Sequence, residues 1–509
     1  MSLDSASKPA RFTFHPLDAY RRKPTQYALL PFRFMRIGPS RFVLVNEVGE
    51  FIFLDEGTFG AFAFKALSAE HPAYLDLKAK HFLADDTSSP LLDVLATKYR
   101  TKKSFLRGFT KLHLFVVTLR CDHSCHYCQV SRQSEDRAAF DMKPSTARKA
   151  VDLMLKTPAE AITMEFQGGE PLLNFELIKF MVEYSEARNQ DLSRRIDRVI
   201  TTNLSKATPD ILEYCRGHKI GLSTSLDGPE WLHNANRPRP GNDSYSRVIE
   251  NIALVRSIVG PGSVDALMTT TRRSLMHVRD IVDEYVARGF RSIFLRSISP
   301  YGFAVKTRGK TGYLTDEFLE FYREGLSYIL ELNCRGIEMT EIYAKILLTK
   351  ILTPFPASFT DLQSPAGLGI GAVVYNYDGD VYASDEARML AEMNDKTFRL
   401  GNVHDDTYDT IFRSEKLRSI VAASVNESLP GCSDCAYQLY CGADPVFHHA
   451  TQGDMMGHRP TSEFCRKNMA IINELLRYID SGDNDVMRIF WGWVYNRRLA
   501  EEEAACPVK

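Results

Sequence analysis

The chain has 509 residues, a formal net charge of −1 at pH 7, 44% hydrophobic residues and 25% charged residues. This length predicts about two to four domains, and the composition is that of a soluble globular protein. The near-zero charge argues against a nucleic-acid partner, because such binders usually carry a basic excess. No stretch reaches the roughly 18 apolar residues of a membrane span, and residues 1–12 contain no apolar signal core, so we expect a cytoplasmic protein without a membrane partner.

The N-terminal part, residues 1–105, is predicted to be a small α+β domain. Apolar residues alternate along residues 26–54 around turn residues, which is typical of short strands and a hairpin. Residues 57–70 and 75–85 have the apolar spacing of helices. Two interpretations of this domain are open: a winged-helix type that recognises a peptide, and a structural embellishment without that role.

The central part, residues 106–300, alternates short apolar strands with amphipathic helices. Six alternations predict a parallel α/β sheet, and the steady repeat favours a partial (β/α)6 barrel of TIM type over a doubly wound sheet. The predicted strands are residues 112–119, 161–166, 197–203, 221–227, 264–271 and 292–299, and the helices begin near Ser145, Asn174, Pro209, Tyr245 and Leu275.

The C-terminal part is predicted to contain three segments. Residues 301–362 have the spacing of a helical bridge, and residues 363–470 form a cysteine-rich domain that opens with a hairpin turning at Asp378 and Gly379. Residues 471–509 are predicted to be a helical tail whose aromatic group FWGWVY favours a docking face.

The chain's ten cysteines are too few for a disulfide scaffold, so their grouping carries the information. Cys121, Cys125 and Cys128 form CDHSCHYC directly after the first predicted strand, where the active site of a parallel barrel lies. Three thiolates leave a tetrahedral zinc one ligand short, and no fourth cysteine or well-spaced histidine follows nearby. Three thiolates suit a cubane iron-sulfur cluster with one open iron.

A second motif, QGGEP, follows the second predicted strand. Gly168 and Gly169 let the backbone approach a ligand closely, and Glu170 adds a charged acceptor for an ammonium group. An ordinary turn would explain the glycines alone. Two motifs at consecutive strand ends favour a shared binding site.

Together, CxxxCxxC and GGEP resemble the radical S-adenosylmethionine (radical SAM) superfamily. The resemblance implies that the three cysteines hold a [4Fe-4S] cluster whose open iron binds S-adenosylmethionine. One electron from the cluster then cleaves the cofactor to a 5′-deoxyadenosyl radical. The resemblance also implies that the GGEP element binds the amino group of the cofactor's methionine. Tyr127 agrees with the superfamily's preference for an aromatic residue before the third cysteine.

Four further polar residues follow later strands, where superfamily members contact S-adenosylmethionine or substrate. The one arginine among them has a position suited to binding a carboxylate. The alternative is that these are ordinary turn residues. The four are Asn203, Ser225, Asp227 and Arg237.

A second cysteine group lies toward the C-terminus. Four thiolates in this arrangement could hold structural zinc or a second iron-sulfur cluster. The segment resembles the SPASM-type extensions of radical SAM enzymes that modify peptides and proteins, which implies one distal auxiliary [4Fe-4S] cluster. The four ligands would be Cys432, Cys435, Cys441 and Cys465.

The segment departs from the full SPASM pattern at three positions. Ser364, Ser384 and Pro445 stand where full members have cysteines, so we expect the proximal auxiliary cluster to be absent and two [4Fe-4S] clusters in total. Asp385 directly follows Ser384. In sulfatase-maturing relatives the matching aspartate takes up a substrate proton, which makes Asp385 a candidate catalytic base. The alternative is an ordinary acidic residue beyond a hairpin.

The chain also resembles the maturases of His-Xaa-Ser peptide-modification systems. This resemblance rests on LLPFRFMRI and VLVNEVGEFIFLD in the N-terminal part, and on DGDVYASDEARML and CGADPVFHHATQGDMMGHRPTSEFC in the SPASM-like part. This resemblance implies a radical SAM oxidoreductase that abstracts hydrogen from a ribosomally made precursor peptide and installs a crosslink or related side-chain modification. The reductant would be a protein such as flavodoxin or ferredoxin. Two alternatives are an anaerobic sulfatase-maturing enzyme that forms formylglycine, and a non-catalytic zinc-bearing peptide-binding protein. The missing proximal ligands and the added N-terminal domain count against sulfatase maturation.

Overall fold

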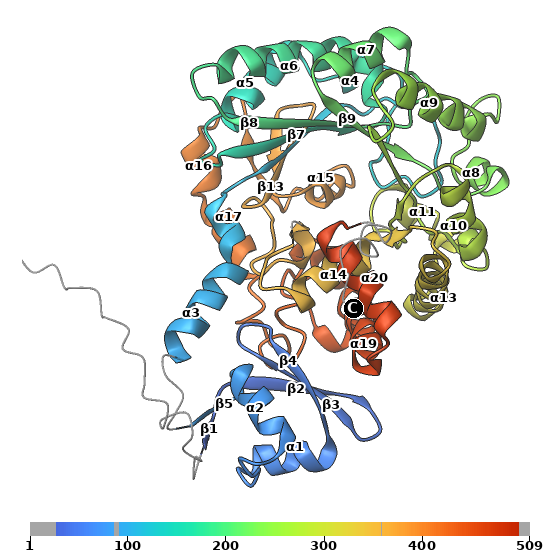
Figure 1. The fold of residues 1–509 in the computed structure, drawn as a ribbon. Helices are drawn as coiled ribbons and strands as arrows, with labels where there is room; N and C mark the ends of the chain where they lie inside the picture. The colour runs from blue at the N-terminus through green and yellow to red at the C-terminus, as the bar shows by residue number, and fades with distance from the viewer. Residues whose placement is uncertain (1–26, 86–90, 358, 498–509) are drawn as a thin grey trace, which may run out of the picture. The chain divides into compact units, whose positions relative to one another are not determined.

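The computed structural model describes residues 27–85, 91–357 and 359–497 (Figure 1). The chain divides into two compact units, Met1–Arg100 and Thr101–Lys509, and each is described by itself. Residues 1–26 of the predicted N-terminal domain, Cys506 and the end of the predicted tail lie outside the described residues. Among the described helices, none combines the length and the apolar character that crossing a bilayer requires.

The first unit has an α+β structure. Strands β2, β3 and β4 form an antiparallel meander in sequence order, and β1 pairs antiparallel with β5. Phe62, Leu77 and Phe82 are fully buried in the apolar core that the helices and strands share. The elements are β1 Tyr27–Leu29, β2 Phe32–Gly38, β3 Arg41–Asn46, β4 Phe51–Asp55, α1 Glu56–Ala63, α2 Pro72–Ala79, β5 Leu83–Asp85 and α3 Leu91–Lys102, which continues past the unit boundary.

Residues 75–85 differ from the single helix that their apolar spacing predicts. Helix α2 ends at Ala79, and His81 has a left-handed φ of +57°. Leu83 is fully buried and pairs with Leu29 of β1. Core packing and strand pairing therefore override the helical pattern of the last residues.

The second unit contains an eight-stranded sheet in the order β10-β9-β8-β7-β6-β13-β14-β15. Strands β6 to β10 are parallel and adjacent in sequence order, which confirms the predicted parallel α/β sheet. Figure 1 shows helices α5, α6 and α7 along one face of these strands. The strands are β6 Leu112–Thr118, β7 Ala161–Gly168, β8 Arg195–Thr201, β9 Ile220–Ser225 and β10 Val264–Leu267, and the helices are α4 Arg137–Phe140, α5 Pro144–Met154, α6 Phe175–Asn189, α7 Pro209–Gly217, α8 Glu230–Asn236, α9 Ser244–Ile258 and α10 Val278–Ala287.

The sixth predicted strand is shorter than expected and does not join this ladder. Only Ser292–Ile293 form a strand, β11, which pairs parallel with β12, Thr340–Glu341. One backbone hydrogen bond, from Thr270 N–H to the Arg296 carbonyl at 2.9 Å, keeps the following residues beside the end of β10. Residues 294–299 do not continue the strand; they line a cavity instead.

The other edge of the sheet is formed by the cysteine-rich segment. Strand β13 pairs parallel with β6, and the chain returns antiparallel through β14 after a turn with Gly379 at φ +91°. This hairpin occurs where Asp378 and Gly379 predict it. The elements are β13 Ala372–Tyr375, β14 Asp380–Tyr382, α15 Asp385–Ala391, β15 Arg399–Asn402, α16 Tyr408–Phe412, α17 Glu415–Ala422 and α18 Pro445–Gln452.

The helices of the predicted bridge and tail pack against one another. Contacts join α13 and α14 to both α19 and α20. Their polar and apolar faces alternate with helical spacing, and the apolar faces are buried. The elements are α11 Phe303–Lys306, α12 Arg308–Thr311, α13 Thr315–Cys334, α14 Ile342–Leu352, α19 Glu463–Ser481 and α20 Asn484–Tyr495.

The ends of β6 and β7 approach so closely that no side chain fits between them. A Cβ atom on Gly168, which has φ +142°, would lie 2.0 Å from the Thr118 carbonyl oxygen. A Cβ atom on Gly169 would lie 2.2 Å from the Arg120 carbonyl oxygen. The glycines therefore allow the ends of β6 and β7 to pack against each other. This role adds to the one predicted from the sequence, which was to let the backbone approach a ligand closely.

We predict that Gly169→Ala lowers the free energy of unfolding by about 3 kcal/mol, because the added methyl group forces the two strand ends apart. Gly217→Ala is the matched control, since Gly217 is exposed in α7 and nothing lies within 4 Å of the position that its added methyl group would take. The control should be neutral or stabilised by up to about 1 kcal/mol. Urea unfolding of both variants measures the difference, and equal stabilities would contradict the packing argument.

Candidate active site

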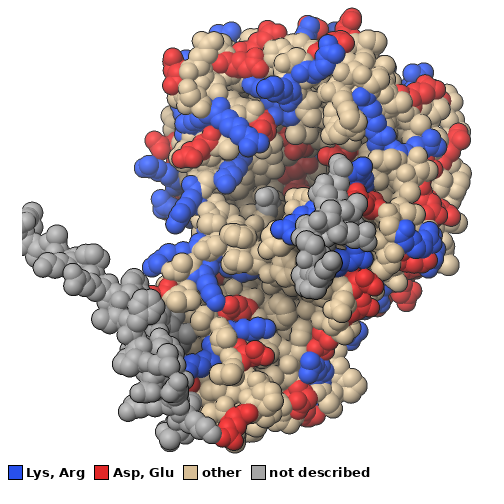
Figure 2. All heavy atoms as spheres, in the orientation of Figure 1, with Lys and Arg blue, Asp and Glu red and all other residues tan. Residues whose placement is uncertain are grey.

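A cavity of about 510 Å³ lies at the carboxyl ends of the parallel strands. Its walls come from the loops after β6 to β10, from the hairpin segment that includes Asp385, and from helix α19. Figure 2 shows acidic side chains in the depth of a hollow on this face. This is the end of a parallel sheet at which active sites form.

The three cysteines of CDHSCHYC all line this cavity. Neighbouring segments hold their loop through its backbone: Ser124 N–H donates to Pro238 at 2.7 Å, and Phe303 N–H donates to Cys128 at 2.8 Å. The Thr307 hydroxyl donates to the carbonyl of the loop residue His126 at 2.7 Å. The loop is therefore supported from two sides that lie far from it in the sequence.

The neighbouring cysteines act electrostatically on Cys121 and on Cys125. Burial raises the pKa of Cys121 well above its ordinary value, and the neighbouring Cys125 adds to the effect. Burial also raises the pKa of Cys125 to about 12; Arg237 opposes this shift and Cys128 adds to it. Three half-buried thiols that line one cavity would be stabilised as thiolates by a positive metal centre, so the donor set fits an iron-sulfur cluster.

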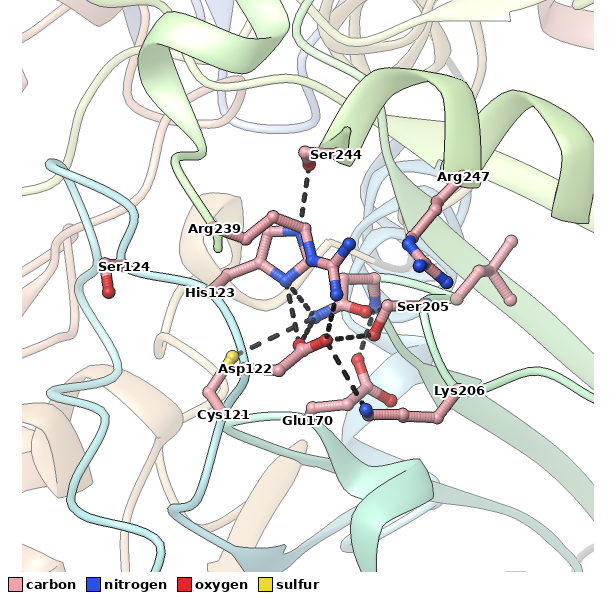
Figure 3. Close-up of polar contacts among 12 residues, drawn as sticks. Cys121, Asp122, His123, Ser124, Glu170, Ser205, Lys206, Arg239, Ser244 and Arg247 are labelled. Carbon is pink, nitrogen blue, oxygen red and sulfur yellow. Dashed lines mark hydrogen bonds and ion pairs between the residues drawn. The ribbon is translucent and has the colours of Figure 1, made fainter. Parts of the chain in front are cut away.

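A hydrogen-bond network lies behind the first cysteine (Figure 3). Asp122 accepts from His123 Nδ1 at 2.8 Å, from Asn203 Nδ2 at 3.0 Å and from Ser205 Oγ at 2.7 Å. Although burial opposes it, these hydrogen bonds hold the pKa of Asp122 below its usual range. His123 Nε2 also bonds to Ser244 Oγ at 2.8 Å.

The same network argues against a zinc ion bound by Cys121, Asp122 and His123. Ligand atoms of Cys121, Asp122 and His123 lie within 4.8 Å of one another, which is a spacing that a metal ion could use. However, both ring nitrogens of His123 and both carboxylate oxygens of Asp122 already have protein partners. The pair therefore serves to hold the cysteine loop.

Glu170 lies beneath the cavity wall. Its side chain is fully buried, and it accepts from Leu172 N–H at 3.0 Å, Thr202 Oγ at 2.5 Å and Asn203 N–H at 2.7 Å. This differs from the expected contact with an ammonium group, because the carboxylate links the ends of β7 and β8 instead. Gly168 and Gly169, by contrast, do line the cavity.

Asp227 is likewise fully buried, where it bonds to two other predicted site residues. Its carboxylate accepts from the Tyr127 hydroxyl at 2.6 Å and from Arg237 Nε at 3.1 Å. The Arg237 guanidinium also lies over the Tyr127 ring at 5.3 Å. Tyr127 and Arg237 line the cavity, so Asp227 orients both of them.

The remaining predicted residues of the strand ends and the hairpin also line the cavity: Asn203, Ser225 and Asp385. Asp385 is the first residue of α15. Its carboxylate accepts a hydrogen bond at 2.9 Å from Arg388, and the Arg388 side chain is fully buried.

Glu165 on β7 is a cavity residue that the sequence analysis did not predict. Glu165 lines the cavity, and burial raises its pKa. The hydrogen bond from the Thr201 hydroxyl opposes this shift, and the charge of Asp385 adds to it. The sequence contained one sign of this residue's role: it is charged and stands in a strand between Met164 and Phe166, whose side chains are buried on the other face.

The four C-terminal cysteines come together although they are spread along the chain. Burial raises the pKa of Cys441 to about 12, with Cys435 and Cys465 adding to the effect. Arg459 Nε lies 3.0 Å from Cys432 Sγ, and Lys350 Nζ donates to the Cys441 carbonyl at 3.1 Å. Positive groups beside four clustered thiols fit an anionic thiolate-bound cluster.

The three residues that depart from the full SPASM pattern have local structural roles. Ser364 Oγ donates to Glu427 and accepts from Asn426 N–H at 2.9 Å. Ser384 caps helix α15 by accepting from Ala387 N–H at 3.2 Å, and Pro445 is the first residue of α18. Each residue is thus committed to a hydrogen bond or a helix end.

Comparison with known families agrees with this site. Residues 115–285 match the Radical SAM superfamily, and residues 369–436 match SPASM, an iron-sulfur cluster-binding domain. The chain therefore carries a radical SAM domain and a SPASM domain. The SPASM match includes Cys432 and Cys435, which favours iron over zinc at the second cysteine group. The two matches favour an enzyme over the non-catalytic zinc-bearing protein.

Two relatives illustrate the range of sequence similarity. An uncharacterized protein of Methanocaldococcus jannaschii is 29% identical over 190 residues, which is 37% of this chain and 63% of the relative, slightly less than two thirds of its length. A cysteine-type anaerobic sulfatase-maturating enzyme of Clostridium perfringens (strain 13) is 24% identical over 341 residues, covering 63% of this chain and 84% of the relative.

Solved structures share the fold. Native anSMEcpe with bound AdoMet has a TM-score of 0.60 and 18% identity, and the match covers 74% of this chain and 100% of that one. Its complex with AdoMet and the Kp18Cys peptide has a TM-score of 0.59. Streptococcus suis SuiB bound to precursor peptide SuiA has a TM-score of 0.51 and 14% identity, and the match covers 85% of this chain and 98% of that one.

We predict that Asp227→Asn lowers the free energy of unfolding by about 3–5 kcal/mol, because it leaves the buried Arg237 without a counter-charge. The matched control is Asp197→Asn, which breaks an exposed pair with Arg195 at 3.0 Å and should cost at most about 1 kcal/mol. Urea unfolding of the iron-loaded proteins measures both. If both variants lost the same free energy of unfolding, the Asp227–Arg237 pair would contribute no more to stability than an exposed ion pair.

A second prediction concerns the buried Glu170. Burial raises its pKa from 4.5 to about 7, although hydrogen bonds from Thr202, Asn203 and Leu172 oppose the shift. Between these values the folded carboxyl keeps a proton that the unfolded chain has lost, so stability falls as pH rises through this window.

Glu170→Gln should remove this contribution, which amounts to at most about 1.4 kcal/mol per pH unit. Unfolding midpoints of wild type and variant at pH 5.5 and pH 7.5 test the expectation. The same pH dependence in both proteins would contradict it.

Proposed function

We propose that this radical SAM enzyme is a maturase that modifies a ribosomally made precursor peptide. The observation that carries the proposal is the cavity itself, which is lined both by three thiols at the strand ends and by carboxylates of the SPASM segment. When bound, the cluster and S-adenosylmethionine supply a 5′-deoxyadenosyl radical that abstracts a hydrogen atom from the substrate. A volume of about 510 Å³ fits a cofactor together with one substrate side chain.

The protein's own residues have separate tasks in this proposal. Cys121, Cys125 and Cys128 hold the radical-generating cluster. The cavity-lining residues hold S-adenosylmethionine, whereas Glu170 and Asp227 are positioning residues that act through their neighbours. The cofactor contacts would be Tyr127, Gly168, Gly169, Asn203, Ser225 and Arg237.

Asp385 is our candidate for the base that receives a substrate proton. Its carboxylate lines the cavity, and Arg388 holds it in one orientation at 2.9 Å. Glu165 lies close enough for the two carboxylates to interact electrostatically.

The peptide substrate is inferred from the solved relatives and from the first unit. SuiB and anSMEcpe were each solved with a bound peptide, and their folds match this chain. The three-stranded meander of the first unit has two edge strands, β2 and β4, to which an extended leader peptide could pair. The product would carry a crosslink or a related side-chain modification, and flavodoxin or ferredoxin would supply electrons.

Sulfatase maturation is the second candidate. It is favoured by the match to the Clostridium perfringens sulfatase-maturating enzyme over 84% of that protein's length. The first unit and the serines at positions 364 and 384 favour the peptide-crosslinking reaction. Formylglycine formed in a cysteine or serine peptide would establish the second candidate.

We predict about eight iron atoms per reconstituted chain, from two [4Fe-4S] clusters. Cys121→Ala should lose about half of this iron and all conversion of S-adenosylmethionine to 5′-deoxyadenosine, because the radical-generating cluster loses a ligand. Cys441→Ala should lose the other half and keep some 5′-deoxyadenosine formation. Cys334→Ala is the control, since Cys334 is exposed and belongs to neither group.

The assay is anaerobic incubation with S-adenosylmethionine and dithionite, with and without candidate precursor peptides from neighbouring reading frames. Mass spectrometry should detect loss of hydrogen from the peptide. Stoichiometric zinc with no iron, or no 5′-deoxyadenosine under any condition, would contradict the proposal.

A further inference from the structure

Three carboxylates from separate segments meet in the wall of the cavity that the cysteine loop also lines. Asp361 belongs to a 3-10 turn, Thr360–Leu362; Glu386 lies in the first turn of α15; and Asp444 is the N-cap of α18. All three line both the main cavity and a small recess of it, which also contains Ser384. We call these three residues the acidic subsite.

The acidic subsite has no ion-paired counter-charge. Among the described residues, none forms an ion pair with any of the three carboxylates. Burial raises the pKa of Asp361, and the charges of Arg296 and Lys467 oppose this shift. Lys467 acts on Asp444 in the same sense. Lys467 Nζ, however, donates to Ser297 Oγ at 3.3 Å and lies over the rings of Tyr343 and Phe464.

This lack of counter-charge has an electrostatic consequence. Burial raises the pKa of Glu386 to about 8, and the neighbouring Asp361, Asp385 and Asp444 add to the effect. Burial likewise raises the pKa of Asp444 to about 7, with Asp361 adding to it. Like charges that are buried together are costly, so a cation placed among them would be bound favourably.

Tyr301 provides an independent sign of a ligand at this place. Its side chain is only 1% exposed, it lines the main cavity, and its hydroxyl has no hydrogen-bond partner among the described residues. Asp444, Glu386 and Asp361 all act on this hydroxyl electrostatically, which locates it beside the acidic subsite. Buried polar groups are normally paired, so an unpaired hydroxyl facing a cavity indicates a group that arrives with a ligand.

The geometry favours an organic cation over a metal ion. Among the described residues, only Cys121, Asp122 and His123 bring three ligand atoms within 4.8 Å of one another, so the three carboxylates are more widely spaced than a bare ion requires. The aromatic side chains of Tyr301 and Phe447 line the same cavity. Carboxylates combined with aromatic faces suit an alkylammonium or guanidinium group, whose stem packs on the rings.

We propose that the acidic subsite binds a positively charged side chain of the substrate, a lysine ammonium or an arginine guanidinium, and so determines which residue of the peptide faces the cysteine loop. The proposal rests on the proposed function as a peptide-modifying enzyme. Asp361, Glu386 and Asp444 supply the negative field, and the Tyr301 hydroxyl accepts a hydrogen bond from the cation.

The test measures binding rather than turnover. The probes are N-acetyl-lysine methylamide and its neutral analogue N-acetyl-norleucine methylamide, each titrated anaerobically into the iron-loaded full chain by calorimetry. We expect the lysine probe to bind about tenfold more tightly, which corresponds to 1.4 kcal/mol. Glu386→Gln and Tyr301→Phe should each reduce this preference by about threefold or more.

Glu320→Gln is the matched control, because Glu320 is exposed on α13 and does not line the cavity, and the change removes one negative charge. Iron content and circular dichroism of each variant report folding. If Glu386→Gln fails to fold, Tyr301→Phe decides the matter, since it removes only a hydroxyl group.

Equal affinity for the two probes, or an equal effect of Glu320→Gln, would overturn the proposal. Binding of magnesium ion alone that depends on Glu386, without a lysine preference, would overturn it in favour of a metal site. Cleavage of S-adenosylmethionine is measured separately. Intact cleavage without a lysine preference refutes the acidic subsite alone, whereas absent cleavage refutes the proposed function.

Discussion

The close approach of the β6 and β7 backbones is the constraint on which the site depends. Gly169 N–H and Glu170 N–H donate to the carbonyls of Thr118 and Arg120 at 2.8 and 2.7 Å, and the glycines leave no room for a side chain between the strands. This contact locates the start of the cysteine loop beside the end of β7. The Glu170 carboxylate extends the link to β8 by accepting Asn203 N–H. Buried, mutually bonded groups of this kind make the three strand ends one rigid support.

The polar residues of the site form two layers. Asn203, Ser225 and Arg237 line the cavity, whereas Glu170 and Asp227 are fully buried beneath it. A buried charge is tolerated only when protein groups satisfy it, and both carboxylates have such partners. The buried carboxylates therefore fix the orientation of the residues that line the cavity. A substitution in either layer is expected to alter the shape of the cavity wall.

The SPASM segment closes the site from the opposite side. Strand β13 joins the edge of the radical SAM sheet beside β6, so the same hydrogen-bonded sheet supports the cysteine loop and the hairpin that leads to α15. The serines and proline that depart from the full SPASM pattern cap or begin local structure. Glu386 and Asp444, close to them in sequence, line the same cavity as the three thiols.

The sequence by itself determined the α/β class, the three-cysteine loop and the GGEP turn, because helical and strand periodicity and short motifs depend on neighbouring residues. It also predicted the hairpin at Gly379, whose left-handed φ few other residues adopt. Local pattern could not show that residues 83–85 form a strand, since that depends on β1 and the core. Only the tertiary structure decided that Glu170 faces inward, and that carboxylates distant in sequence meet Tyr301, because these contacts arise from packing between segments rather than within them.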